Sequence, residues 1–299
     1  MKLVITIPAY NEEKTIGDVI LKIKKIMKKE KYSYKILVVD DGSTDNTANV
    51  SKKSGANVFS HPRNYGLAET FRTEIKKSLE LKADVIVHID ADGQYQPEEI
   101  PKLFKEIKNG YDLVLGSRFL GKIEYMPLIK RLGNKLFSKV VSNITKTKIT
   151  DAQTGFRAFT KDMAKQIDVI STHTYTQEQI IRAVLEKFKI KEVPVNFKRR
   201  KGKSRLLKNP IEYGIKALLN IMRVYRDYEP IKFFGLFSIF FFLIGAVIGT
   251  YFLYLHFTVG ISGHLGLVII MIISIITGTQ ITLFAFFADM LRNRRKKIN

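Results

Sequence analysis

Short apolar runs alternate with longer, helically spaced apolar segments along the first part of the chain. The short runs are rich in β-branched residues and end at Pro, Gly or Asp, which is typical of buried strands. The longer segments repeat their apolar residues every three or four positions, as one face of a helix does. The predicted strands are 3–7, 35–39, 58–59, 85–89 and 112–116, and the predicted helices are 12–29, 47–53, 66–81, 97–108 and 174–185. This alternation predicts an α/β fold with a mostly parallel sheet covered on both faces.

The pattern changes after residue 208. Residues 211–225 place apolar side chains on one helical face and Lys or Arg between them, which predicts an amphipathic helix at a membrane interface; packing on the domain is the alternative. Residues 233–255 and 265–288 carry no charge, and each run exceeds the ~20 residues that cross a bilayer. We therefore predict a globular domain over 1–208, a juxtamembrane helix over 209–230 and a two-helix transmembrane hairpin over 231–299.

Basic residues flank this hairpin on one side only. Lys232 precedes the first span and a basic tail over 292–297 follows the second, whereas the connection 256–264 lacks Lys and Arg. The positive-inside rule then places the globular domain and both termini in the cytoplasm. Gln280, inside the second span, is interpreted as a contact between helices.

The formal charge of +22 implies an anionic partner. No nucleic-acid module is recognisable and the charge lies beside the membrane segments, so membrane lipids and a lipid phosphate are favoured over nucleic acid. Cysteine is absent, which excludes disulfides, a thiol nucleophile and a cysteine zinc site.

The strand over 85–89 runs directly into Asp90 and Asp92. Two carboxylates at this spacing suit a Mg²⁺ or Mn²⁺ ion that carries substrate phosphates, although such a pair alone is often only a polar loop. Two other predicted strands end in similar signals, Tyr10-Asn11-Glu12 and Asp40-Asp41. Because ligands of open α/β sheets bind at the carboxyl ends of strands, the three signals together favour a site.

Three motifs resemble family 2 glycosyltransferases, which have the GT-A (Rossmann-like) nucleotide-sugar fold. They are Pro-x-Tyr-Asn-Glu over 8–12, Val-Val-Asp-Asp-Gly-Ser-x-Asp-x-Thr over 38–47 and Asp-Ala-Asp-Gly-Gln over 90–94. More narrowly, Gly-Ser-Arg at 116–118, Thr-Gly-Phe-Arg at 154–157 and Arg-x-x-Gly-x-Ser at 199–204 are similar to polyprenyl-phosphate hexose synthases of the dolichyl-phosphate mannose synthase type. The resemblance covers about the first 205 residues.

The resemblance implies a role for each motif residue. Nucleotide-sugar binding is implied for Pro8, Tyr10, Glu12, Val39, Asp41, Asp90, Ala91, Asp92 and Gln94, and metal binding for Asp90, Asp92 and Gln94. Acceptor-phosphate binding is implied for Arg118, Arg131, Asn134, Arg199, Lys201, Ser204 and Arg205, and catalysis for Asp92, Arg118 and Glu178. Related synthases often have Arg at position 130, where this chain has Lys, and Ser at position 134. They also have small residues where this chain has Phe71-Arg72-Thr73, which we interpret as a packing difference.

Two of these assignments keep an alternative. Glu178 lies in the first turn of a predicted helix, where an acid complements the helix dipole without further function. The basic run over 198–205 is either a solvated loop or a binding site for a lipid phosphate or anionic headgroups.

The expected function is transfer of a hexose to polyprenyl (dolichyl) phosphate with inversion, giving a lipid-linked sugar donor for glycosylation. The donor is left open among GDP-mannose, UDP-glucose and UDP-N-acetylglucosamine, and homo-oligomerisation is left open too. A phosphate acceptor is already anionic at neutral pH and needs no strong general base. The alternatives are a non-lipid acceptor, a polysaccharide synthase, whose Gln-x-x-Arg-Trp motif a chain without Trp cannot carry, and a non-catalytic membrane-surface binder, against which the intact carboxylate pair argues.

Overall fold

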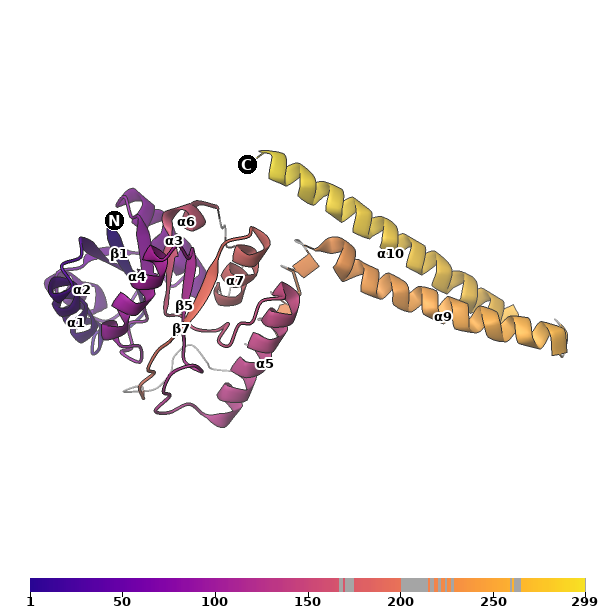
Figure 1. Cartoon of the computed structure of the whole chain (residues 1–299), viewed down its shortest axis with the longest axis horizontal. Coiled ribbons are helices and arrows are strands. Elements are labelled where there is room, and N and C mark those ends of the chain that lie inside the picture. Colours follow the sequence, from indigo (N-terminus) through magenta and orange to yellow (C-terminus); the bar gives the residue numbers. More distant parts are fainter. Residues whose placement is uncertain are drawn as a thin grey trace. The chain divides into compact units, whose positions relative to one another are not determined.

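The chain divides into two compact units, Met1–Ile221 and Met222–Asn299 (Figure 1). The structure is a computed structural model that describes residues 1–166, 169, 175–199, 229–258, 260 and 265–298, with scattered helical positions between 215 and 226. Most of the predicted amphipathic helix over 211–225 therefore lies outside the described residues.

The first unit is an α/β domain. Its strands are β1 (Leu3–Ala9), β2 (Tyr34–Asp40), β3 (Asn57–Ser60), β4 (Val85–His88), β5 (Leu113–Ser117), β6 (Arg157–Thr160) and β7 (Ile190–Pro194). Its helices are α1 (Ile16–Lys29), α2 (Thr47–Lys53), α3 (Leu67–Glu80), a 3-10 turn (Pro97–Glu99), α4 (Ile100–Lys108), α5 (Leu128–Thr145), α6 (Lys161–Gln166) and α7 (Thr176–Leu185).

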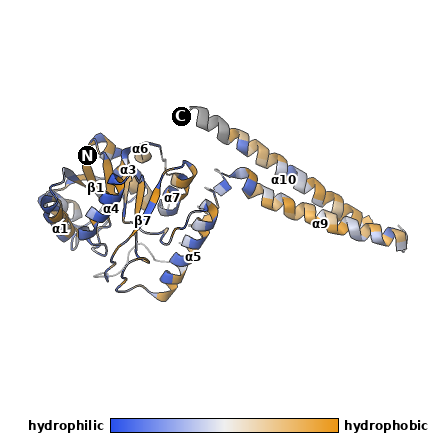
Figure 2. Cartoon of the chain, in the orientation of Figure 1, coloured by the Kyte–Doolittle hydropathy of each residue, from blue (hydrophilic) through white to orange (hydrophobic). Residues whose placement is uncertain are grey.

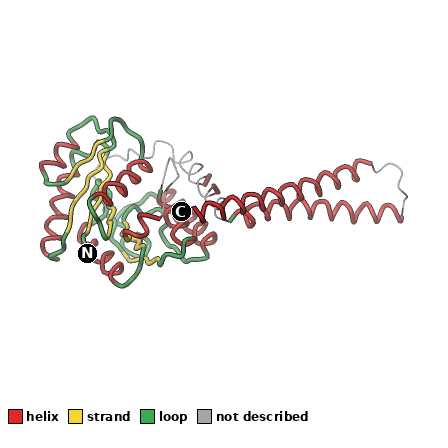
Figure 3. Tube along the Cα trace, turned by 90° about the horizontal axis from the view of Figure 1, so that it is seen from above, coloured by secondary structure: helices red, strands yellow, loops and turns green. Residues whose placement is uncertain are grey.

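Within the described residues the strands form a seven-stranded sheet with the order β3-β2-β1-β4-β6-β5-β7. Only β6 runs antiparallel to its neighbours β4 and β5, so the predicted mostly parallel sheet is confirmed. The strands β6 and β7 and the helix α5 were not predicted from the sequence. Helices lie on both sides of the strands (Figure 3).

Alternate side chains of β4 enter two different layers, as the twofold period of a strand requires. Val85 and Val87 belong to the main core cluster together with residues of α1 and α4. His88 faces the other layer, where its ring lies 5.6 Å from the ring of Phe71 on α3, measured between centroids. The end of β4 therefore carries a polar side chain inside a buried layer.

The order of the strands reverses beside β1. β2 and β3 extend the sheet to one side of β1, and β4 pairs with its other edge. A crevice forms outside the carboxyl ends of the strands at such a reversal, and it is where open α/β sheets bind their ligands. All three polar signals of the sequence follow β1, β2 and β4, so the topology gathers them at this crevice.

The second unit consists of α9 (Pro230–Thr258) and α10 (Leu265–Ile298), which contain the predicted apolar spans. Both helices are long and apolar enough to cross a membrane (Figure 2). Small residues bring them together: Ser238 Oγ donates to the Gly278 carbonyl at 2.9 Å, and a Cβ on Gly245 would lie 2.9 Å from Ile275. Gln280 is exposed on α10, so its interpretation as a contact between these two helices is wrong.

Candidate active site

The loops that follow β1 and β2 are joined by hydrogen bonds. The Asn11 N–H donates to Ser43 Oγ at 2.8 Å, and the Thr44 N–H donates to Asn11 Oδ1 at 2.8 Å. The Glu12 N–H donates to Thr47 Oγ1 at 2.8 Å. Asn11 has a φ of 55°, a left-handed conformation that Asn adopts more readily than most residues. The two loops therefore form one rigid wall of the crevice.

Four of the residues implied in nucleotide-sugar binding belong to β1, β2 and these joined loops: Pro8, Tyr10, Glu12 and Val39. Pro8 and Val39 are paired in the register of β1 and β2. Glu12 follows in the same joined loops, and Tyr10 is 38 % exposed. An exposed ring at the edge of a polar crevice provides a surface on which a planar base can stack.

Asp41 is buried and holds a neighbouring loop. Its carboxylate accepts hydrogen bonds from the Tyr65 N–H at 2.9 Å and the Gly66 N–H at 2.8 Å. Nδ1 of His61 lies 2.8 Å from Asp41 Oδ1, and Nε2 of the same ring lies 2.9 Å from Thr73 Oγ1. In this structure the Asp41 carboxylate therefore holds the loop around Tyr65 and Gly66 next to the wall formed by the β1 and β2 loops.

The Asp-x-Asp loop is fixed to a segment from the far end of the domain. Asp92 Oδ1 accepts the Gln94 N–H at 3.0 Å. The Gln94 side chain donates to the Lys198 carbonyl at 3.1 Å, and the Lys198 N–H donates to the Gln94 carbonyl at 2.9 Å. The residues that follow β7 thus set the conformation of the loop that carries both acids.

Asp90 lies between a glycine and a buried histidine. A Cβ on Gly155 would lie 2.9 Å from Asp90 Oδ1, so only glycine fits against this carboxylate. On the other side, Nε2 of His88 lies 3.7 Å from Asp90 Oδ1. Burial disfavours the ionised Asp90, but the contact with His88 and the positive charges of Arg118 and Lys130 outweigh it and lower the pKa of Asp90. An ionised carboxylate that is 37 % exposed therefore faces the crevice.

Arg118 follows β5 directly and is bound by Asp151. Its Nε and Nη2 donate to the two oxygens of Asp151 at 2.7 and 2.8 Å, and its backbone N–H donates to the same carboxylate at 3.0 Å. Burial disfavours the charged guanidinium, but Tyr95 and Asp151 outweigh this effect and raise the pKa of Arg118. Arg118 is thus a fixed cation with a defined orientation.

Asn134 of α5 contacts this cation. With its amide oriented so that both polar atoms have partners, Oδ1 accepts from Arg118 Nη2 at 3.2 Å. Lys130 precedes Asn134 by one helical turn and therefore shares its face of α5. The charge of Lys130 acts on Asp90, whereas Arg131 is exposed. The structure therefore brings Asp90, Arg118, Lys130 and Asn134 together, and it places Arg131 on the adjoining surface.

The remaining predicted site residues have other surroundings. Glu178 is buried in the first turn of α7 and accepts a hydrogen bond from Arg182 Nε at 2.7 Å. Arg199 is exposed, and its guanidinium carbon lies 5.1 Å from the centroid of the Tyr125 ring. The predicted acceptor residues Lys201, Ser204 and Arg205 lie outside the described residues.

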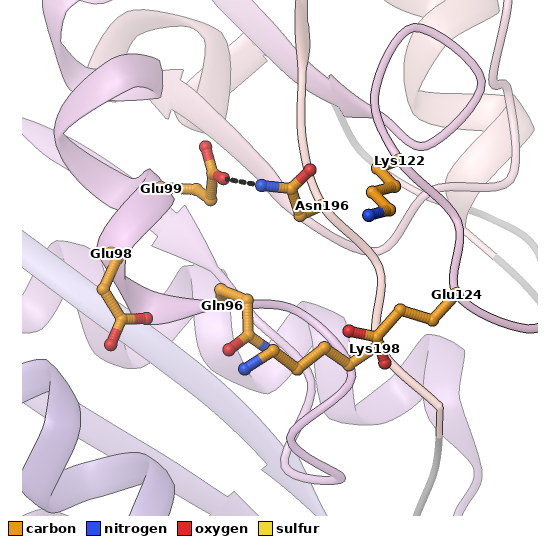
Figure 4. A pocket seen from close by; sticks show the side chains of 7 residues that line it. All are labelled: Gln96, Glu98, Glu99, Lys122, Glu124, Asn196 and Lys198. Carbon is orange, nitrogen blue, oxygen red and sulfur yellow. Dashed lines mark hydrogen bonds between the residues drawn. The ribbon is translucent and has the colours of Figure 1, made fainter.

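A polar pocket of about 360 Å³ adjoins the Asp-x-Asp loop (Figure 4). Asn196 Nδ2 donates to Glu99 Oε1 at 3.0 Å inside it. The lining residues are Gln96, Glu98, Glu99, Lys122, Glu124, Asn196 and Lys198. Lys198, whose backbone is hydrogen-bonded to Gln94, also lines this pocket, so the pocket lies next to the Asp-x-Asp loop.

Several residues of this site were not predicted as such from the sequence. Asp151, Gly155 and His88 come from three separate segments, and only the fold places them against Arg118 and Asp90. Lys130 could have been identified as a site residue from the sequence, because it precedes the predicted acceptor residue Asn134 by one helical turn.

The domain has a GT-A-like fold, and the chain belongs to glycosyl transferase family 2, whose family model matches residues 4–168. It is therefore a glycosyltransferase. A crystal structure of glucosyl-3-phosphoglycerate synthase from Mycobacterium tuberculosis, in complex with Mn²⁺, UDP-glucose and phosphoglyceric acid, is similar to it with a TM-score of 0.59 and 19 % identity. The similarity covers 75 % of this chain and 79 % of that chain, and at this identity it supports the shared fold alone.

Relatives in archaea are named as polyprenyl-phosphate sugar transferases. A dolichyl-phosphate hexose transferase of Haloferax volcanii is 31 % identical over 74 % of this chain and 93 % of its own length. A UDP-N-acetylglucosamine–dolichyl-phosphate N-acetylglucosaminyltransferase of Methanococcus voltae is 34 % identical over 63 % of this chain and 82 % of its own. A dolichol-phosphate mannosyltransferase of Pyrococcus furiosus is 29 % identical over 90 % of this chain and 76 % of its own.

Proposed function

We propose that the protein transfers a hexose from a nucleotide sugar to a polyprenyl phosphate at a membrane surface, with inversion at the anomeric carbon. The observation that carries the proposal is the position of α5. Lys130 and Asn134 of this helix lie beside Arg118 and Asp90, while the same helix exposes an apolar stripe. A phosphate site beside an apolar surface suits an acceptor with an anionic head and a hydrocarbon chain.

The apolar stripe is unusually exposed for a soluble domain. The exposed fractions of Leu128, Ile129, Leu132 and Leu136 are 75, 81, 68 and 64 %. Most large exposed apolar patches mark an interaction surface. Basic residues flank the stripe, which suits an anionic lipid surface. The stripe therefore supports a membrane-bound acceptor over a water-soluble one.

Asp90, Asp92 and Gln94 provide oxygen donors that suit Mg²⁺ or Mn²⁺. Among the described residues no group of three or more acidic, His or Cys side chains could hold a metal. Under the proposal the carboxylates of Asp90 and Asp92 and the amide oxygen of Gln94 would hold the ion next to the donor diphosphate. When bound, the ion supplies positive charge that stabilises the departing nucleotide diphosphate.

The chain's own residues then perform positioning and charge stabilisation. The wall around Tyr10 and Glu12 holds the nucleotide, and the Asp-x-Asp loop orients the diphosphate. Arg118, Lys130 and Asn134 hold the acceptor phosphate so that one oxygen faces the anomeric carbon on the side opposite the leaving group. Alignment and neutralisation suffice because the attacking phosphate is already anionic. Product NMR tests the inversion, since a retained anomeric configuration would contradict it.

The hairpin of α9 and α10 is proposed to span the membrane, with the α/β domain and both termini in the cytoplasm. The distribution of Lys and Arg supports this orientation. The chain has no cysteine, so a single cysteine in the connection 256–264 can be labelled with a membrane-impermeant maleimide. We expect labelling from the outside of intact cells there, and labelling of Asn57→Cys, in the α/β domain, only after permeabilisation. The reverse pattern would contradict the orientation.

A direct comparison of acceptors tests the proposed function. We expect transfer to polyprenyl phosphate in detergent and none to 3-phosphoglycerate, the acceptor type named for the structural neighbour. Transfer to 3-phosphoglycerate alone would show a water-soluble acceptor. In that case the apolar stripe of α5 would serve only to attach the domain to the membrane.

A further inference from the structure

A buried chain of polar side chains lies behind Asp90. Glu74 of α3 and His88 of β4 are fully buried, and Tyr175 is 1 % exposed. Glu74 Oε2 lies 2.7 Å from His88 Nδ1, and the Tyr175 hydroxyl lies 2.8 Å from His88 Nε2. The His88 ring therefore has a close polar partner at each nitrogen, and Asp90 lies beyond Nε2 at 3.7 Å.

The surrounding packing fixes this ring. Phe71 stacks on Tyr175 with centroids 3.7 Å apart and planes 9° apart, and both rings pack against His88 edge-on. The bulky Phe71 and the acidic Glu74 are both on the buried face of α3. Phe71 was interpreted from the sequence as a packing difference from the related synthases. In the structure its ring covers the buried polar network of His88 and Tyr175.

An ordinary core histidine would be satisfied by partners that are themselves buried. Here the network reaches a carboxylate that faces the crevice, since the Asp90 side chain is 37 % exposed. Gly155 closes the opposite side of the same carboxylate, where no Cβ fits. Asp90 is thus confined between a backbone segment and a ring whose own position is set by Glu74 and Tyr175.

We propose that His88, held by Glu74 and Tyr175, is a positioning residue that fixes the Asp90 carboxylate in its binding orientation before the metal and the donor diphosphate arrive. The inference rests on the proposed function, because it takes Asp90 as a ligand of the metal–diphosphate complex. Residues behind a metal ligand typically change metal affinity or activity about 10- to 100-fold when they are replaced. His88 is therefore assigned a role in the metal-dependent part of donor binding.

The test compares binding with and without metal in the full-length protein in detergent. Titration calorimetry with UDP and with GDP, in Mn²⁺ and in EDTA, separates the metal-dependent part of the nucleotide affinity from the metal-independent part. We expect His88→Gln to weaken Mn²⁺-dependent binding about 10- to 100-fold and to leave binding in EDTA unchanged. Ile86→Val, on the same strand and face but without contact to Asp90, serves as the matched control and should change neither. A purely structural role would lower both affinities together.

Each outcome has a definite meaning. If folded His88→Gln keeps its Mn²⁺-dependent affinity within about twofold of the wild type, or loses both affinities equally, the positioning role is overturned. If His88→Gln gives no cooperative melt, Glu74→Gln is judged by the same criteria, because it removes the charge that holds the ring. If the wild type binds neither UDP nor GDP in a Mn²⁺-dependent way, the proposed function itself fails, and the inference fails with it.

Discussion

The backbone of Gly155 lies against the carboxylate of Asp90, so closely that a Cβ would be 2.9 Å from one oxygen and 3.0 Å from the other. Gly155 belongs to the Thr-Gly-Phe-Arg segment before β6, and Asp90 to the loop after β4. The antiparallel pairing of β4 with β6 brings the two together. This contact explains why a glycine far along the chain is needed for the geometry of the Asp-x-Asp loop.

Gly155→Ala should displace Asp90 and reduce kcat/KM about 10²-fold, since small misplacements in an aligned site have effects of that size. Gly133→Ala is the control, because a Cβ there meets nothing within 4 Å. Steady-state transfer kinetics check both variants. Equal activity of Gly155→Ala and the wild type would mean that Asp90 does not need its observed position.

Asp151→Asn should destabilise the domain, because it removes the carboxylate that forms the buried ion pair with Arg118. Both side chains of the pair are almost fully buried, at 5 and 0 % exposure. Loss of one partner of such a pair costs about 3–5 kcal/mol, which lowers Tm by roughly 6–20 °C for a domain of this size. Circular dichroism melts of this variant and of Asp162→Asn, an exposed acid, check the prediction. Similar melts for the two variants would contradict it.

His88 should be protonated at neutral pH. Burial disfavours the imidazolium, but the negative charge of Glu74 and the contacts with Asp90 outweigh it and raise the pKa of His88 from 6.5 to about 9. A pKa that is higher in the folded state means stabilisation that is fully present below about pH 6.5 and is lost as the pH rises through about 9. The Tm advantage of the wild type over His88→Gln should therefore shrink between pH 7 and about 10. A Tm difference between the wild type and His88→Gln that stays constant over this pH range would contradict the protonation of His88.

The apolar stripe of α5 should matter for the lipid acceptor and not for the donor. Replacing Leu132 and Leu136 by Gln removes apolar area from the stripe, and we expect KM for polyprenyl phosphate in vesicles to rise about tenfold. KM for the nucleotide sugar should stay unchanged. Asn143→Gln, exposed on the same face of the helix about two turns beyond the stripe, is the control for a polar substitution that removes no apolar area. An unchanged KM for polyprenyl phosphate in the double variant would show that α5 does not contact the membrane surface.

The regular parts of the fold could be predicted from the sequence because their patterns are local. The alternating runs up to residue 117 correspond to β1–β5 and α1–α4, with ends shifted by a few residues. β6 (Arg157–Thr160) and β7 (Ile190–Pro194) were missed because each is interrupted by polar residues and lacks the run of β-branched apolar residues that marks β1, β2 and β4. α5 was not predicted although its apolar residues recur at helical spacing; in the structure its buried face is mostly polar, with Asn134, Ser138 and Thr145 beside Val141.

The residues of the site also fall into a group that could be predicted from the sequence and a group that could not. Asp90, Asp92 and the loops around Tyr10 and Asp41 follow strands directly, so the sequence order already places them at one edge of the sheet. The partners that fix them are distant in sequence: Gln94 binds Lys198, and Arg118 binds Asp151. No local pattern encodes such pairs, because they depend on the antiparallel insertion of β6 and on the path of the chain after β7.

The most direct test of the central claim is metal-dependent transfer of label into lipid. Radiolabelled GDP-mannose, UDP-glucose and UDP-N-acetylglucosamine would each be incubated with polyprenyl phosphate in detergent, in Mn²⁺, in Mg²⁺ and in EDTA. We predict that one donor labels the lipid phase, that EDTA abolishes the labelling, and that Asp92→Ala abolishes it as well. Label that never enters the lipid phase, from a protein that binds the nucleotide, would contradict the proposed acceptor.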